Sequence, residues 1–234
     1  TAEGVVFTLR LPRIIGAVLV GSALSLSGAA YQGVFKNPLV APDLLGVSSG
    51  ACVGASVAIL LHLNSFGVQA MAFVAGILAV GLTLFIPRLI KNTNMTMLVL
   101  SGIIVKGIMD SVMGIIKYVA DPETELQSIT YWQLGSLTKV LPKDLFTVGP
   151  VIVAASVIIF LLRWRINILS LGDREAKTLG VSVTVVRNFI IICATLLTAS
   201  AVCISGTIGW IGLVIPHFAR MLTGPDNTKA IPAS

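Results

Sequence analysis

Two charged residues interrupt an apolar stretch of this sequence, and their spacing is the first sign of chemistry. Lys106 and Asp110 lie four residues apart within residues 95–116. In a helix this spacing puts both side chains on one face, one turn apart. A charge within a membrane helix is costly, so it usually pairs with another charge or faces a cavity. Two interpretations stay open: the two charges neutralise each other between packed helices, or with Met113 they line a path for a solute.

A second pattern, Gly-Val-Ser-Ser-Gly at residues 46–50, fits the G-x-S-x-G motif of serine hydrolases. That motif needs a sharp turn between a strand and a helix. Here it begins an apolar run, and a protease would also need a histidine partner, His62 or His217. We interpret the segment as a site of tight helix packing. His217 has no partner at ligand spacing, and we expect it to be a packing residue.

The remaining reactive residue types exclude several kinds of site. Cys52, Cys193 and Cys203 all lie within apolar stretches and form no C-x-x-C pair. This arrangement predicts neither a disulfide framework nor a metal site, and small apolar packing residues are the simpler interpretation. The sequence also lacks the Gly-x-x-x-x-Gly-Lys-[Ser/Thr] phosphate loop, so it is not expected to bind ATP in that way.

The composition places these residues in a membrane protein. Hydrophobic residues make up 56% of the chain and charged residues 11%, against about 25% charged residues in soluble domains. Such a chain has too few polar groups to cover a water-facing surface, so lipid must be its main solvent. The net charge of +6 comes from bases in short breaks between apolar runs. These bases indicate membrane topology, and no basic patch with interleaved aromatics suggests nucleic acid.

Helices that cross the membrane must position the candidate residues, and each needs about 20 apolar residues. The sequence predicts seven spans. Three are single apolar runs, at residues 14–35, 95–116 and 145–162. Two longer runs each hold two spans: residues 44–87, with a break at 62–65, and residues 188–219, with a break near 205–209. The seventh is short. The segments 117–144 and 163–187 have helical composition and are expected to hold surface helices. Many small residues in the spans predict close helix packing.

The bases predict the orientation of this bundle. With seven spans, ten bases fall on one side: Lys36, Arg88, Lys91, Arg163, Arg165, Arg174, Lys177, Arg187, Arg220 and Lys229. Five fall on the other side: Arg10, Arg13, Lys117, Lys139 and Lys143. Because cytoplasmic loops carry the excess of Lys and Arg, we expect the C-terminus and residues 163–187 in the cytoplasm.

Several short blocks, in order along the chain, resemble one family of membrane proteins. The blocks are Arg10-Leu11-Pro12-Arg13; Asn37-Pro38-Leu39, Pro42, Leu45-Gly46-Val47 and Gly50; Ala120-Asp121-Pro122; Trp132-Gln133-Leu134-Gly135-Ser136; Leu171-Gly172, Ala176 and Leu179-Gly180-Val181; and Gly206 with residues 209–217, Arg220, Gly224 and Asp226. Together they resemble the FecCD family, the permease subunits of ABC importers for iron–siderophore complexes, haem and corrinoids. The resemblance covers essentially the whole chain.

The resemblance implies a fold, a function and partners. We expect an all-α, polytopic bundle with residues 1–234 as a single permease domain in the inner or plasma membrane. The chain would form the pathway of an ATP-driven importer for metal chelates, with Lys106, Asp110 and Met113 lining it. Its expected partners are a cytoplasmic ATPase that binds the ATP, an external substrate-binding protein, and a second permease chain, identical or paralogous.

Residues 165–183 hold the segment expected to contact the ATPase. The stretch from Leu169 to Val183 is too polar to span a membrane, and its glycines permit turns that end a short helix. From the residues alone, a helix docked on a partner and a helix lying on the membrane surface are equally open. The resemblance favours docking. It implies contacts at Leu171, Gly172, Asp173, Ala176, Leu179 and Gly180.

Two other functions stay open. An ion-coupled secondary transporter would carry several carboxylates within its spans and inverted repeats, and only Asp110 qualifies. A non-transporting remnant is the other alternative, because FecCD permeases resemble ten-span proteins. The resemblance implies that their first span and last two lie outside this chain, which would then be a fragment of a longer protein or a truncated gene product.

Overall fold

A computed structural model describes residues 6–92 and 94–234, and all regular structure in them is helical. The elements are η1 (Val6–Arg10), α2 (Leu11–Phe35), η2 (Pro42–Leu45), α3 (Val47–Leu60), α4 (Ser65–Leu89), α5 (Met95–Val119), α6 (Glu125–Gln133), η3 (Leu137–Lys139), α7 (Pro142–Leu171), α8 (Asp173–Thr178), α9 (Val183–Ser205), α10 (Ile211–Thr223) and α11 (Asn227–Ala233). The predicted all-α class is confirmed. Residues 1–5 and 93 of the predicted single domain lie outside the described residues.

Five stretches are long and apolar enough to cross a membrane: Val6–Phe35, Ser65–Leu89, Met95–Val119, Pro142–Leu171 and Val183–Ser205. The other two predicted spans are the shorter helices α3, of 14 residues, and α10, of 13. At 1.5 Å per residue each is about 20 Å long, short of the roughly 30 Å hydrocarbon core. The described residues therefore hold five long apolar helices and two short ones, where the sequence predicted about seven spans.

The breaks between helices lie where the sequence predicted them, for local reasons. The chain turns at His62, whose φ is 51°, and Asn64 then begins α4 by accepting a hydrogen bond from the Gly67 N–H at 2.8 Å. This is a side-chain cap of the kind that satisfies a free helix N–H. The second predicted break separates α9 from α10 between Ser205 and Ile211.

Helix α7 is longer than the predicted span at residues 145–162. It begins at Pro142, where the missing N–H of proline costs nothing, and the Asp144 carboxylate accepts a hydrogen bond from the Leu141 N–H at 2.9 Å. Its other end continues through Arg163 and Arg165 to Leu171. Arginine is a good helix former, so these bases extend the helix beyond the apolar stretch.

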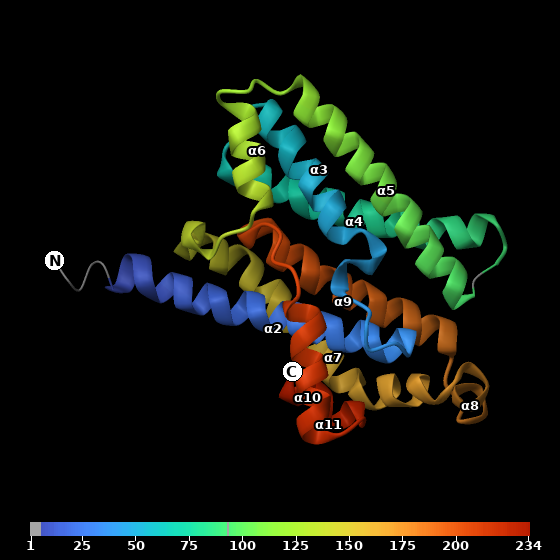
Figure 1. The fold of residues 1–234 in the computed structure, drawn as a ribbon. Coiled ribbons are helices and arrows are strands. Elements are labelled where there is room, and N and C mark those ends of the chain that lie inside the picture. Colours follow the sequence, from blue (N-terminus) through green and yellow to red (C-terminus); the bar gives the residue numbers. More distant parts are fainter. Residues whose placement is uncertain (1–5, 93) are drawn as a thin grey trace.

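The helices pack in two groups, which Figure 1 shows one above the other. Helix α2 packs with α7, α9 and α10, and α11 joins them against α7 and α10. We call this set the α2–α9 group. The second set, the α3–α5 group, consists of α3, α4, α5 and the short α6. Helix α9 also packs against α3 and α4 and so joins the two groups.

Small residues let the helices approach closely, as the sequence predicted. A Cβ atom added to Gly28 of α2 would lie 1.7 Å from the carbonyl oxygen of Gly212 in α10. One added to Gly54 of α3 would lie 2.3 Å from the Met71 carbonyl oxygen in α4. Backbone contact of this kind favours helix association in lipid, where no hydrophobic effect drives it.

Buried polar bonds add to this packing between α2 and α9. The Ser27 hydroxyl lies 2.7 Å from the Thr198 hydroxyl and donates to the Ala194 carbonyl at 2.9 Å. The Tyr31 hydroxyl lies 3.1 Å from the Thr195 hydroxyl. Hydrogen bonds between membrane helices contribute about 0.6 kcal/mol each on average. Two such connections in neighbouring turns therefore add modestly to the packing of α2 against α9.

The ends of the helices gather at two opposite ends of the molecule (Figure 1). At one end, Lys36 after α2 pairs with Asp173 of α8. At the other end, His62 after α3 lies 3.4 Å from Glu125 of α6, and the Ser136 N–H donates to the Ser205 carbonyl. These two groupings match the two sides assigned from the bases. Which side faces the cytoplasm stays a prediction.

Candidate functional site

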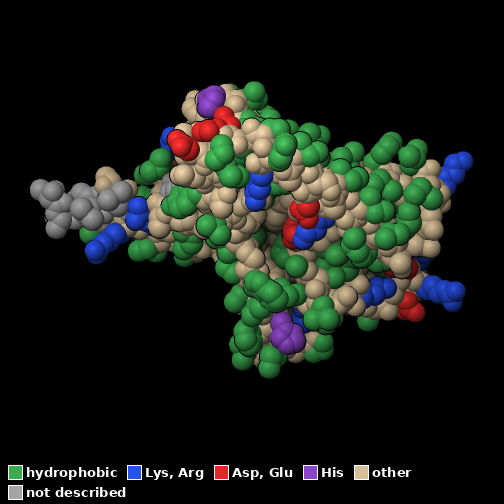
Figure 2. Space-filling model, turned by 45° about the horizontal axis from the view of Figure 1, so that its top comes forward, with side chains coloured by type: hydrophobic (Ala, Val, Ile, Leu, Met, Phe, Trp, Pro, Cys, Tyr) green, Lys and Arg blue, Asp and Glu red, His purple; other side chains and the backbone are tan. Residues whose placement is uncertain are grey.

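A cavity of about 580 Å³ lies between the two helix groups. Its lining residues are Leu24, Ala41, Pro42, Asp43, Ser48, Ser49, Cys52, Lys106, Asp110, Met113, Gln133, Thr198, Thr207, Ile208, Gly209, Trp210, Gly212 and Leu213. We call it the central cavity. Figure 2 shows a hollow with acidic and basic atoms side by side, surrounded by hydrophobic side chains. The lining thus combines charged, hydroxyl and apolar groups.

All three residues that the sequence singled out on α5 line the central cavity. Lys106 and Asp110 are exposed, and Met113 is buried in the wall. The Lys106 ammonium donates to Asp43 Oδ2 at 2.8 Å. Asp110 has no ion-pair partner among the described side chains. The interpretation that Lys106 and Asp110 neutralise each other is therefore wrong, because the acid that pairs with Lys106 comes from another element.

Asp43, which the sequence analysis did not single out, is held by its own segment. It lies in η2, and Gly46, at φ 81°, donates its N–H to the Asp43 carbonyl at 2.9 Å. The Asp43 side chain accepts a hydrogen bond from the Ser48 N–H at 3.1 Å, at the start of α3. One carboxylate thus caps α3 and pairs with α5. The signal in the sequence was an acid directly before a charge-free run of residues.

The opposite wall is the break between α9 and α10. Thr207, Ile208, Gly209 and Trp210 line the cavity there. The Trp210 side chain is 77% exposed, and its backbone has a φ of 70°, a conformation that is unfavourable for a bulky residue. Strained residues of this kind persist where surrounding structure holds them, often at functional sites. Trp210 is therefore a largely exposed aromatic residue at the edge of the cavity, held in a strained backbone conformation.

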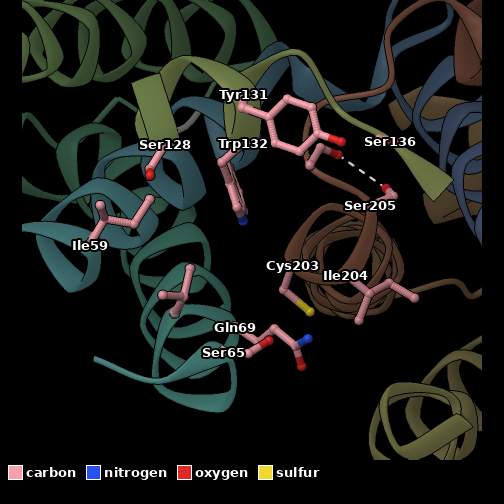
Figure 3. A pocket seen from close by; sticks show the side chains of 12 residues that line it. Ile59, Ser65, Gln69, Ser128, Tyr131, Trp132, Ser136, Cys203, Ile204 and Ser205 are labelled. Carbon is pink, nitrogen blue, oxygen red and sulfur yellow. Dashed lines mark hydrogen bonds between the residues drawn. The ribbon is translucent and has the colours of Figure 1, made fainter. Parts of the chain in front are cut away.

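A second cavity, of about 270 Å³, lies under α6 and is drawn in Figure 3. Ser128, Tyr131 and Trp132 line it from α6, and the Cys203–Gly206 stretch lines it from α9. No pattern in the sequence predicted a cavity at this place. Trp132 packs against the hydrophobic core in both helix groups, so it is part of the packing between α6 and the bundle.

The predicted coupling segment contains a six-residue helix, α8, and a defined turn after it. The Gly180 N–H donates to the Lys177 carbonyl and the Val181 N–H to the Ala176 carbonyl, both at 3.0 Å. With Gly180 at φ 76°, this is the Schellman motif, in which a left-handed glycine ends a helix. The predicted role of Gly180 in ending the helix is confirmed.

The side chains of this segment divide between two faces. Leu171 is 64% exposed and Leu179 is 59% exposed, so both are available to a partner. Ala176, which the resemblance implied as a contact for the ATPase, is fully buried in the core of this chain. The expectation is corrected at this position, because α8 uses its inner side to pack on α7 and α9.

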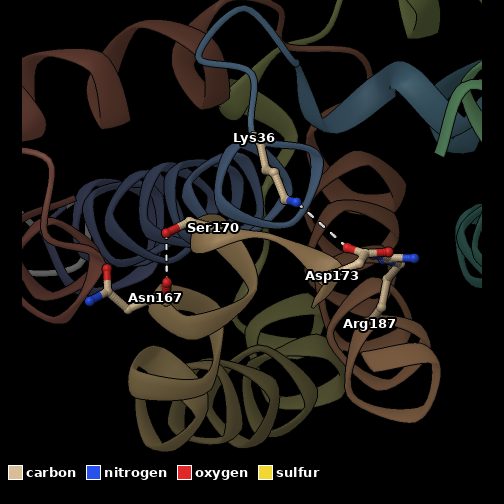
Figure 4. A network of polar contacts seen from close by, with 5 residues as sticks. All are labelled: Lys36, Asn167, Ser170, Asp173 and Arg187. Atoms are coloured by element: carbon tan, nitrogen blue, oxygen red, sulfur yellow. Dashed lines mark hydrogen bonds and ion pairs between the residues drawn. The ribbon is translucent and has the colours of Figure 1, made fainter. Parts of the chain in front are cut away.

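Asp173 begins α8 and joins it to two long helices (Figure 4). Its carboxylate oxygens accept hydrogen bonds from Arg187 Nη2 of α9 at 2.7 and 2.9 Å. Lys36, which follows α2, lies 3.5 Å away. The hydrogen bond from Arg187 is the main reason that the pKa of Asp173 lies below its ordinary value, and the charge of Lys36 adds to the shift.

The remaining candidates lie apart from one another. Ser48 is near the start of α3 and His62 follows its end, which is about 20 Å of helix. His217 is exposed on α10. Within residues 6–92 and 94–234, no three His, Cys, Asp or Glu side chains come together in a group that could hold a metal ion.

The sequence profile of the FecCD transport family matches residues 1–234. The chain belongs to this family. Three FecCD relatives illustrate the range of solutes for which permeases of this family are named. The molybdate import system permease protein MolB of Haemophilus influenzae is 38% identical, over 99% of this chain and 69% of its own length. A probable iron chelatin transport system permease protein of Helicobacter pylori is 40% identical, over 98% of this chain and 69% of its own length. The hemin transport system permease protein HmuU of Yersinia pestis is 36% identical, over 97% of this chain and 69% of its own length.

Solved structures agree with the FecCD fold. A metal-chelate type ABC transporter in an inward-facing conformation superposes with a TM-score of 0.94 at 36% identity, over 99% of this chain and 74% of that chain. PsaBC from Streptococcus pneumoniae, in complex with a Fab, has a TM-score of 0.67 at 20% identity, over 95% of this chain and 76% of that chain. The second likeness concerns the fold alone.

Several of the FecCD blocks in the sequence fall on the two regions described above. Pro42 and the residues around Gly209 and Trp210 line the central cavity. Leu171, Gly172, Leu179 and Gly180 surround α8. Several of the segments that carry the resemblance therefore help to build the cavity and the end of the bundle nearest α8.

Proposed function

We propose that this chain forms the membrane pathway of an ATP-driven importer of metal chelates. The observation that carries the proposal is the central cavity, which lies between two helix groups and is lined by Lys106, Asp110 and Met113. A cavity between two bodies can open to either side when one body moves against the other, which is how transporters give alternating access. In this family the energy comes from a separate ATPase, and α8 is the contact that we assign to it.

The substrate class is proposed from the lining and from the relatives. The named relatives include permeases for molybdate, an iron chelate and hemin. Here Trp210 offers an aromatic surface, while Asp43, Lys106 and Asp110 offer charged groups. A metal chelate has an organic shell with polar metal-binding atoms, and ligand sites combine apolar surface with a few polar groups. Iron–siderophore, haem and corrinoid complexes all suit such a lining.

The partners follow from the exposed residues at the two ends of the bundle. Leu171, Leu179 and Gly180 form the contact proposed for the cytoplasmic ATPase. The opposite end, around α6, would receive chelate from an external binding protein. Lys106 and Asp110 are exposed on α5, so we propose that a second permease chain, identical or paralogous, completes the pathway. The complex would lie in the inner or plasma membrane.

The test uses the complete importer in proteoliposomes, with the ATPase inside and the binding protein outside. Uptake of a ferric hydroxamate, haemin and vitamin B12 is measured with and without ATP. We expect ATP-dependent uptake of at least one chelate, and a loss of uptake in Trp210→Ala. The matched control is Trp164→Ala, because Trp164 is exposed on α7, away from the cavity lining.

Three results would contradict the proposal. An ATPase that fails to co-purify with the chain would remove the energy source. Uptake driven by an ion gradient without ATP would instead indicate a secondary transporter. Equal loss of uptake in Trp210→Ala and Trp164→Ala would mean that the central cavity has no special part in transport.

A further inference from the structure

The segment proposed to contact the ATPase is attached to one helix group. Helix α8 packs against α7 and α9, and Ala176 is buried in the core that these helices share. Lys36 and Arg187, which hold Asp173, come from the end of α2 and the first turns of α9. A displacement of α8 would therefore act on the α2–α9 group.

The two side chains of the contact between Asp173 and Arg187 differ in burial. The Arg187 side chain is only 10% exposed, while that of Asp173 is 50% exposed. The buried Arg187 Nε has no hydrogen-bond partner among the described residues. Among the described residues, Asp173 is therefore the only acidic partner of this nearly buried guanidinium. Removing the carboxylate would leave that charge buried and unpaired, which is strongly unfavourable.

From this contact, two helices lead directly to the central cavity. Arg187 and Thr198 are both on α9, and Thr198 lines the cavity. Lys36 follows α2, whose Leu24 also lines the cavity. The hydrogen bond between Ser27 and Thr198 joins the two helices close to that wall. The α3–α5 group supplies the facing wall, through Ser48, Lys106 and other residues.

We propose that Asp173, held by Arg187 and Lys36, is the joint through which α8 moves the α2–α9 wall of the central cavity. Arg187 and Lys36 are then positioning residues for the coupling of ATP hydrolysis to transport. The inference rests on the proposed function, because it assumes that the ATPase docks on α8. It adds that this ion pair, together with the packing of α8 on α7 and α9, passes a displacement of α8 on to the cavity wall.

The experiment compares ATP hydrolysis with uptake of a ferric hydroxamate in the same proteoliposomes, again with the complete importer. In Arg187→Gln we expect the ATPase to co-purify and hydrolyse ATP. Chelate imported per ATP should fall by roughly tenfold, within the usual range of coupling between two sites. A loss of folded protein would lower both rates in proportion and leave this ratio unchanged. The ratio therefore separates a role in coupling from a merely structural role.

Three further variants complete the test. Arg165→Gln is the matched control, because Arg165 is exposed on α7 at the same end and has no ion pair among the described residues; its ratio should stay at the wild-type value. Arg187→Lys keeps the charge and should restore much of the ratio. Lys36→Gln should lower the ratio less than Arg187→Gln, since Lys36 lies farther from Asp173.

The outcomes test separately the role of the Asp173 ion pair in coupling and the proposed function of the chain as an importer subunit. A wild-type importer that neither binds the ATPase nor imports chelate would contradict the proposed function. If the wild-type importer works and Arg187→Gln imports as much chelate per ATP as wild type, the proposed role of the Asp173 ion pair is wrong. The proposed function would still stand. If Arg187→Gln fails to assemble, Lys36→Gln decides: an unchanged ratio of chelate imported per ATP would overturn the proposed role of the Asp173 ion pair, and a reduced ratio would support it.

Discussion

The ion pair between Lys106 and Asp43 decides what single substitutions in the central cavity should do. Each change alone, Lys106→Leu or Asp43→Leu, leaves one charge without its partner, and an unpaired charge is the costly state in a membrane protein. The double variant removes both charges. Because Lys106 is partly exposed, we expect a coupling energy of only about 0.5–1 kcal/mol.

The measurement is a double-mutant cycle on thermal stability, with a second cycle on Lys106 and Asp110 as the control. The two changes should be non-additive for Lys106 with Asp43 and nearly additive for Lys106 with Asp110. The reverse result would restore the interpretation based on four-residue spacing. Uptake in the complete importer, measured for the same variants, reports separately on whether these side chains line the pathway.

The sequence could place Lys106 and Asp110 on one face, but it could not find Asp43. The four-residue rule applies within one helix, and Asp43 is 63 residues away from Lys106. Contacts of that kind depend on how η2 folds back against α5, for which the sequence has no local pattern. Trp210 was missed for a related reason, since its exposure arises from the geometry of the break after α9.

The lowered pKa of Asp173 predicts how its contact with Arg187 depends on pH. A carboxyl group whose pKa is lower in the folded than in the unfolded protein stabilises the fold above its unfolded pKa, about 3.9. That contribution is lost as the pH falls through the lowered folded pKa. We therefore expect the difference in melting temperature between wild type and Asp173→Asn to be constant from about pH 5 to 8.

Below about pH 4 the difference should shrink, because the wild-type carboxyl group then becomes neutral as well. Glu123→Gln is a useful control, since Glu123 is exposed and forms no ion pair among the described residues. A difference for Asp173→Asn that changes between pH 6 and 8 would indicate that another titrating group controls the contact.

At the scale of elements, α8 has an outer face and an inner face that should respond differently to substitution. Leu179→Asp puts a charge on the exposed face and should prevent co-purification of the ATPase without changing the melting temperature. Ala176→Leu overfills a buried position and should cost about 1–3 kcal/mol of stability. Loss of ATPase binding in Leu179→Asp together with an equal loss of stability would mean that Leu179 supports the fold instead.

The contact between α2 and α10 gives a second prediction for elements. In Gly28→Ala the added Cβ would lie 1.7 Å from the Gly212 carbonyl oxygen, so the two helices must separate. We expect a loss of about 1–3 kcal/mol or more, as for other overpacked positions. The control is Gly21→Ala on the same helix, where no atom lies within 4 Å of the new Cβ. Equal melting temperatures for the two variants would contradict the close contact.

Elements were predictable from the sequence to the extent that lipid and turn chemistry control them. The long apolar helices and the break at residues 62–65 follow from apolar length and from the capping residue Asn64. The far end of α7 was not predictable from hydropathy, because Arg163 and Arg165 are as compatible with a helix as with a loop. The burial of Ala176 was missed because a short polar segment does not show which of its faces touches the bundle.

The whole molecule consists of two helix groups with the central cavity between them, and the distribution of charge fits this arrangement. Lys36, Asp173 and Arg187 meet at one end of the bundle. Glu125 and His62 meet at the other end. The sequence assigned ten bases to the side that holds α8 and five to the other, and cytoplasmic segments carry the excess of Lys and Arg. The proposed coupling segment therefore lies on the side that is predicted to face the cytoplasm.

This orientation can be measured directly, with exposed residues at the two ends. Glu175 of α8 and Glu123 before α6 are both exposed, and the three native cysteines are buried. In a background with those cysteines replaced by alanine, we would label Glu123→Cys and Glu175→Cys in intact cells with a membrane-impermeant maleimide. Position 123 should react in intact cells, and position 175 only after the membrane is opened. Labelling of position 175 from outside would reverse the orientation, and α8 could then no longer be the contact for a cytoplasmic ATPase.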